Sequence, residues 1–168
     1  MKRIYLKPKK EESLQRFHPW VFSGAIQSIE GNPAEGEEVE VYAADRSFLA
    51  VGHYQIGSIA VRVLSFAPCS INADFWRSRI RDAFSLRMAA GLVRENNTTY
   101  RLVHGEGDHL PGLIVDVYDQ TAVMQAHSAG MHLVRTELAI AIIAEVKGVT
   151  QVYYKSETTL PFKAGLEP

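Results

Sequence analysis

The chain has 168 residues, of which 46% are hydrophobic and 22% are charged, a composition of folded globular proteins that excludes a disordered tail. No apolar run reaches the roughly 18 residues of a membrane-spanning helix, and basic residues rather than an apolar signal region follow Met1, which predicts a cytoplasmic protein without membrane contact. The net charge of −1 gives no general attraction for nucleic acid, and the single cysteine excludes an internal disulfide or a thiolate cluster.

Basic residues are nonetheless concentrated in two stretches. Residues 1–16 contain six basic and two acidic side chains, and residues 72–98 contain five basic and three acidic ones. Such clusters attract a phosphate backbone when they share one surface, although a solvated lysine-rich surface would give the same counts.

The first seventy residues predict a unit of short strands. Residues 38–43 alternate between apolar and polar side chains with period two, which is typical of a strand with one buried face. Pro68 ends this stretch, whose length suits a small β-barrel. Strands are expected at residues 3–6, 20–26, 38–43, 48–52 and 59–63, with a short helix at 13–17 that Ser13 would cap.

The pattern changes at Asn72, which with Asp74 is a candidate N-cap for a helix that continues to about Gly91. A second helix is expected over 132–147, with Gly148 as its left-handed terminator. Strands are expected at 100–103, 113–118, 122–126 and 149–154.

These elements predict a mixed fold: a small β-barrel over residues 1–70, followed by an α+β domain (helix, strands, helix, strand) over 71–156. Residues 157–168 show no periodicity and are interpreted as a linker. A doubly wound, Rossmann-like domain is predicted to be absent, because residues 99–155 give at most one partial βαβ unit.

Sequence patterns for cofactor binding are missing. The nearest approach to a glycine-rich phosphate loop, Gly105-Glu106-Gly107, lies between two strands and opens no helix, so no cofactor-binding or catalytic residue is predicted in this chain. Cys69, between Pro68 and Ser70, is interpreted as a passive thiol rather than a nucleophile.

The loop from His104 to His109 contains residue types that bind metals. Neighbouring loop residues seldom converge on one ion, so the favoured interpretation is a turn in which Asp108 bonds to its own backbone before Pro111. No metal is predicted, and an enzyme that acts through this loop remains an alternative.

An aromatic set in the barrel, His18, Trp20, Phe22 and Tyr54, has the side chains that stack on RNA bases. Filling of the barrel interior is the favoured interpretation for Trp20 and Phe22.

Three segments resemble a known family. Residues 16–26 read RFHPWVFSGAI, residues 49–54 read LAVGHY and lead through Ser58 to IAVRVL at 59–64, and residues 100–116 read YRLVHGEGDHLPGLIVD. In this order they resemble the PUA domain and central-domain hairpin of the ribosomal RNA large-subunit methyltransferase I family, which makes 5-methylcytosine. Gln55-Ile56-Gly57 and His109 depart from the family's usual residues.

The resemblance implies an RNA-docking barrel and a central domain that orients a catalytic domain. In the family a segment like Gly165-Leu166-Glu167 leads into a methyltransferase domain with the S-adenosylmethionine (SAM) site and a cysteine nucleophile, and Cys69 matches no such motif. We therefore expect RNA of the large ribosomal subunit and a missing C-terminal methyltransferase domain as partners, SAM only for the full-length protein, a homodimer as an open option, and no activity of the chain alone.

The residues expected to contact RNA are Lys2, Arg3, Arg16, His18, Ser23, Arg77 and Arg81. A different reading is a freestanding interaction module that docks a protein on Ile140, Ile142 and Ile143 of the second helix.

Overall fold

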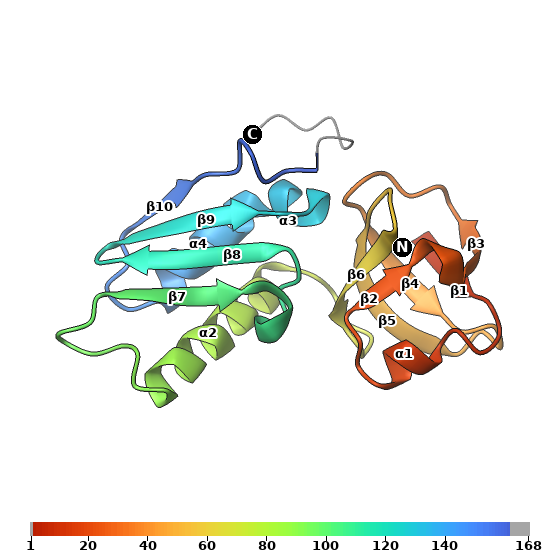
Figure 1. Ribbon diagram of the computed structural model, residues 1–168, viewed down its shortest axis with the longest axis horizontal. Helices are drawn as coiled ribbons and strands as arrows, with labels where there is room; N and C mark the ends of the chain where they lie inside the picture. The colour runs from red at the N-terminus through yellow and green to blue at the C-terminus, as the bar shows by residue number, and fades with distance from the viewer. Residues whose placement is uncertain (1, 162–168) are drawn as a thin grey trace.

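A computed structural model describes residues 2–161, which form two β-sheets in lobes that lie side by side (Figure 1). The first lobe contains β1 (Lys2–Leu6), α1 (Glu12–Gln15), β2 (Trp20–Phe22), the 3-10 helix η1 (Ser23–Ala25), β3 (Ile26–Glu30), β4 (Glu38–Tyr42), β5 (Phe48–Tyr54) and β6 (Ile59–Ser65).

The six strands of the first lobe are ordered β2-β6-β5-β4-β1-β3. β4, β5 and β6 form an antiparallel meander. The N-terminal strand β1 pairs in parallel with β4 at the border of this meander. β2 stands at one end of the order and pairs only with β6. Its exposed edge is therefore available for other contacts.

The second lobe contains α2 (Ala73–Ala89), β7 (Thr99–His104), η2 (Gly105–Asp108), β8 (Leu113–Tyr118), β9 (Thr121–Ala126), α3 (Ala129–Leu133), α4 (Arg135–Glu145) and β10 (Gln151–Tyr154). Its strands are ordered β10-β9-β8-β7, and only the β9–β10 pair is parallel. The parallel pair requires a crossover, which α3 and α4 provide.

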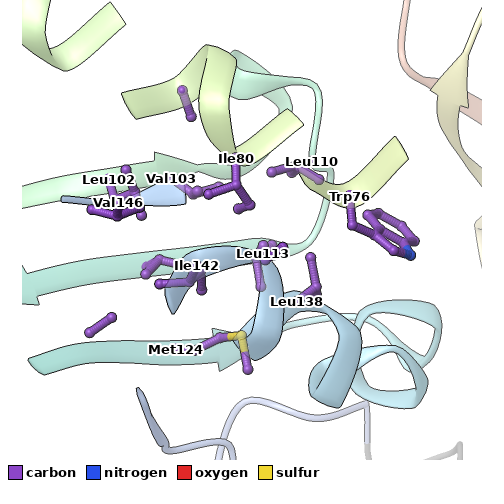
Figure 2. Close-up of a cluster of buried hydrophobic side chains, with 14 of the residues drawn as sticks. Trp76, Ile80, Leu102, Val103, Leu110, Leu113, Met124, Leu138, Ile142 and Val146 are labelled. Atoms are coloured by element: carbon purple, nitrogen blue, oxygen red, sulfur yellow. The ribbon is translucent and has the colours of Figure 1, made fainter. Parts of the chain in front are cut away.

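Each lobe has its own hydrophobic core. The second core lies between the sheet and the α2–α4 layer. It includes Ile80 of α2 and Leu138 and Ile142 of α4, while Trp76 of α2 lies at the end of the cluster (Figure 2). Asn72 starts α2 by accepting a hydrogen bond from the Phe75 backbone N–H at 3.0 Å, as its capping role predicts.

The lobes meet at a tightly packed contact between β5 and α3. The His53 ring fits against Gly130 so closely that a Cβ at that position would clash with it. On its other side His53 lies 6.0 Å from the Trp76 ring, measured between centroids. His53 is buried, and its Nδ1 has no hydrogen-bond partner among the described residues.

Some predicted elements differ from the observed ones. The helix expected over 132–147 is two helices: Ser128 accepts a hydrogen bond from the Met131 N–H and so starts α3 earlier, and the backbone leaves helical geometry at Val134. The short helix begins at Glu12 without a capping side chain, so the expected role of Ser13 is wrong.

The predicted linker over 157–168 extends beyond the described residues, as does the segment 165–167. In the part of the chain that is described, no helix is long and apolar enough to cross a membrane.

Candidate nucleic-acid interface

Three aromatic rings lie together on and just before the edge strand β2. Because alternate residues of an extended chain share a face, His18, Trp20 and Phe22 project to the same side. Their ring centroids are 5.7 Å (His18–Trp20), 6.2 Å (Trp20–Phe22) and 6.0 Å (His18–Phe22) apart. We call these three residues the aromatic strip.

The strip is open to solvent at Phe22, which is 47% exposed. Packing of Phe22 inside the barrel, the favoured prediction, is therefore wrong for this residue, while Trp20 is half-buried. The reason is that β2 is a three-residue edge strand whose one inward side chain is Val21, so its neighbours face away from the barrel core. An exposed ring of this kind can stack on an unpaired base.

Arg62 of β6 lies directly across from Trp20 in the sheet register. Its guanidinium carbon is 6.0 Å from the centroid of the Trp20 ring, within the range of a cation–π contact. Burial lowers the pKa of Arg62, and the nearby Glu106 carboxylate partly offsets this effect. The strip thus has a cation beside its central ring, that of Trp20.

Glu106 of η2 connects this cation and the strip to the second lobe. Its Oε1 accepts a hydrogen bond from Trp20 Nε1 at 2.8 Å and lies 3.6 Å from an Arg62 nitrogen. Trp20 is therefore fixed in orientation by a contact between the two lobes.

Two pockets share Arg62 in their lining. One, of about 310 Å³, is otherwise lined by residues of the β5–β6 turn from Gln55 to Ile59 and by Pro161. The other, of about 200 Å³, has Glu106, Ile114 and His127 of the second lobe in its lining. We call these two pockets together the junction groove.

His127 lines one of the two pockets of the junction groove. Its pKa is lowered chiefly by burial and also by the Arg62 charge, while Glu106 acts in the opposite direction. At neutral pH the ring is uncharged, so it can donate one hydrogen bond and accept another.

The residues predicted to contact RNA do not all lie near the strip. Arg16, at the end of α1, and Ser23, directly after Phe22, are exposed next to it in the chain. Lys2 and Arg3 are on β1, which is separated from β2 by three strands in the sheet order.

Both β1 cations have local partners. Lys2 Nζ lies 2.7 Å from Glu37 Oε2 and donates to the Asn32 carbonyl at 3.0 Å. Arg3 lies 3.6 Å from Glu40. These two cations lie apart from the strip, and each is paired with a carboxylate.

Arg77 and Arg81 lie in the other lobe and share one carboxylate. Arg77 Nε donates to Glu145 at 2.7 Å, and Arg81 makes two bonds to it at 2.8 and 3.1 Å. The two guanidinium groups hold the pKa of Glu145 at about 2, with Arg81 the larger influence. The one carboxylate offsets one of the two positive charges, so this face keeps a net positive charge.

The His104–His109 loop is held by internal contacts. Asp108 is buried, forms a bidentate ion pair with Arg87 and accepts the His104 backbone N–H at 2.6 Å. Its side chain thus bonds the backbone at the start of the loop and not its own backbone before Pro111, and the Arg87 partner was not predicted. Among the residues that the structure describes, no three His, Cys, Asp or Glu side chains are grouped to hold a metal.

The predicted contact residues did not include Arg62, Glu106 and His127, which line the groove. Arg62 had a usable signal, because it is the single charged residue in the strand IAVRVLS. Glu106 and His127 had none, since only the tertiary fold brings η2 and the end of β9 against β6.

A family model described as a PUA-like domain matches residues 4–66, which contain the strip and Arg62. A ribosomal RNA large subunit methyltransferase I from Vibrio vulnificus is 40% identical over 165 residues, and one from Shewanella amazonensis is 41% identical over 167. Each alignment covers 98% of this chain and 41% of the relative.

The chain is thus a relative of the ribosomal RNA large subunit methyltransferase I proteins. It spans about two fifths of the length of these relatives. The resemblance to this family that the sequence motifs indicated is confirmed.

Two solved structures have the same fold over most of this chain. A chain from Streptococcus mutans assigned as a SAM-dependent methyltransferase has a TM-score of 0.80 at 18% identity and covers 93% of this chain. A chain assigned as a methyltransferase and complexed with SAH has a TM-score of 0.79 at 17% identity and covers 98%. This chain matches 41% of each.

These structures correct the predicted fold class, which separated this chain from a methyltransferase fold by declaring the Rossmann-like domain absent. Nearly all of the chain matches the fold of about two fifths of each of these methyltransferase chains, so that separation is wrong. The prediction relied on the lack of a glycine-rich turn and of βαβ repetition, which mark a nucleotide-binding unit and do not test the fold of the other parts of such a chain.

Proposed function

We propose that this chain positions ribosomal RNA for a SAM-dependent methyltransferase of the large-subunit rRNA family, and that the aromatic strip is its main RNA contact. The observation that carries the proposal is the aromatic strip, exposed at Phe22 and with the Arg62 cation beside Trp20, on the unit that matches a PUA-like domain. The relatives' names supply the substrate class.

The chemistry of the strip suits RNA that is locally unpaired. Aromatic rings stack on any base, and hydroxyl and backbone groups near Ser23 can contact phosphates and sugars without sequence preference. Selectivity would then come from RNA shape and from a few exposed bases.

The seven predicted contact residues divide into two groups under this proposal. Arg16, His18 and Ser23 contribute to the strip, whereas the β1 cations and the α2 arginines add at most long-range attraction, because each has a carboxylate partner.

SAM as methyl donor belongs to the proposal because the solved neighbours are assigned to SAM-dependent chemistry and one holds SAH. A SAM site needs an apolar slot for adenine and a carboxylate for ribose hydroxyls. In the described pockets with apolar walls, Asp108 is already bound by Arg87 and Glu106 by Trp20. The described residues do not complete such a site, and we assign no step to the cofactor here.

The test is RNA binding by the chain, measured by fluorescence anisotropy with a labelled RNA stem–loop over a range of salt concentrations. We expect binding that weakens steeply with salt. Phe22→Ala should reduce the affinity roughly 10-fold or more, since a base–aromatic stack contributes about 1–3 kcal/mol.

Tyr118→Ala is the matched control, because Tyr118 is similarly exposed but lies on β8 of the other lobe. Equal losses for the two variants, or no binding by the wild-type chain at low salt, would refute the proposal.

The alternative of a protein-docking face on α4 is not favoured. It required Ile140, Ile142 and Ile143 to be exposed together, but Ile142 is fully buried in the second core. Nothing among the described residues supports the homodimer that the sequence left open.

A further inference from the structure

The junction groove contains a largely buried cation with few partners. The Arg62 side chain is 14% exposed, so water solvates little of it. Its nearest acceptors are Gln55 Oε1 at 3.4 Å and Glu106 Oε1 at 3.6 Å, both beyond the length of a strong charge-assisted hydrogen bond. A guanidinium has five N–H donors, and these two long contacts use little of that capacity.

The Arg87 pair shows what a satisfied buried arginine looks like in the same molecule. Arg87, with a similarly buried side chain, holds Asp108 by a bidentate fork. Arg62 has no such fork, and burial of its charge is compensated only in part.

Glu106 does not neutralise Arg62 in this way because its Oε1 accepts the Trp20 indole N–H at 2.8 Å. The carboxylate is thereby oriented toward the indole, and its Oε1 stays 3.6 Å from the nearest guanidinium nitrogen of Arg62. The two pockets that Arg62 lines leave room for an anion to approach its guanidinium.

We propose that the junction groove binds a phosphate of the RNA backbone, with Arg62 as the principal ligand and His127 as a second donor. The proposal rests on the proposed function and adds a specific anchor beside Trp20 of the aromatic strip. A phosphate accepts two parallel bonds from a guanidinium, the geometry that Arg62 lacks in the free chain. Bases flanking that phosphate would then lie beside Trp20 and Phe22.

Glu106 gives the proposal an unusual test, because its charge opposes a bound phosphate. Glu106→Gln removes that charge, and the amide oxygen can still accept the Trp20 bond. We expect this variant to bind the RNA stem–loop several-fold more tightly than the wild type. A residue with only a structural role would weaken binding or leave it unchanged.

Arg62→Gln should lower the affinity roughly 10- to 100-fold, the usual range for loss of a charged hydrogen-bonding partner. It should also reduce the slope of log affinity against log salt by about one. Arg94→Gln is the matched control, since it makes the same charge change at an exposed loop position in the second lobe. Its loss should be much smaller.

The outcomes separate the two proposals. If Phe22→Ala weakens binding but Arg62→Gln behaves like Arg94→Gln, the phosphate site is overturned and RNA docking on the strip stands. If Glu106→Gln binds no more tightly than wild type, the phosphate site is also overturned. Should Arg62→Gln fail to fold by circular dichroism, Glu106→Gln decides the question, and a wild-type chain that binds no RNA overturns both proposals.

Discussion

At the junction between the lobes, Arg62 is largely buried and has only long contacts, whereas on the helical face Arg77 and Arg81 are exposed and closely paired with Glu145. The usual expectation is the reverse, because burial of a charge normally requires close partners. The junction is thus the region whose polar groups are left ready for a ligand, and the helical face is the region whose cations already have a close acceptor.

His53 extends the contrast. It too is buried at the junction, and its Nδ1 has no partner among the described residues. Charge in a sequence is therefore a poor guide to binding, and the partners that the fold supplies decide which cation is available.

The largest effect is expected at the one buried pair that is satisfied. Asp108→Ala should destabilise the chain by about 3–5 kcal/mol, because it leaves the Arg87 guanidinium buried and uncompensated. The measurement is the free energy of unfolding from urea titration. Arg77→Ala, which breaks an exposed pair, is the control and should cost far less.

A loss below about 1 kcal/mol for Asp108→Ala would mean that solvent reaches Arg87 more freely than its burial indicates. The contrast between satisfied and unsatisfied buried cations would then lose its basis.

A pH effect is expected at His53. Burial lowers its pKa from 6.5 to about 4, so the folded chain binds fewer protons than the unfolded chain between these values. The contribution of His53 to the free energy of unfolding is fully present above pH 6.5. It is lost as the pH drops toward 4, by roughly 3 kcal/mol. Urea titrations at several pH values should show this loss.

His53→Gln isolates the contribution of that ring. His127 and His132 also have lowered pKa values, but both are present in the variant, so their effects cancel in the difference between the two stability curves. A wild-type curve that runs parallel to that of the variant from pH 7 to 4 would show that His53 is solvated when protonated.

Periodicity and capping predicted most of the secondary structure, because these signals are local. The period-two run from residue 38 is β4, and Asn72 caps α2 as expected. Local signals failed where tertiary contacts decide: Phe22 was expected in the barrel core and is exposed, and the helix predicted at 132–147 is broken at Val134.

The site was harder to predict than the elements. His18, Trp20 and Phe22 could be found because they alternate within one short segment. The groove combines Arg62, Glu106 and His127 from three distant segments, and no spacing in the sequence encodes that arrangement. The predicted fold class was wrong for a related reason. The absence of a glycine-rich turn and of βαβ repetition was taken as evidence against a methyltransferase fold.

The smallest effect is expected at the paired arginines, which the sequence ranked with the RNA contacts. Arg77→Gln with Arg81→Gln should change RNA affinity far less than Arg62→Gln, although it removes twice the charge, because both guanidinium groups already donate to Glu145 and lie in the other lobe. Anisotropy titrations with the same RNA stem–loop compare the variants directly.

Glu145→Ala is the complementary change, because it removes the carboxylate that accepts hydrogen bonds from both guanidinium groups. If affinity rises strongly in that variant, the helical face lies within reach of the RNA and its arginines are restrained by Glu145. If affinity is unchanged, the difference between the two regions is one of position as well as pairing, and RNA contacts end at the junction.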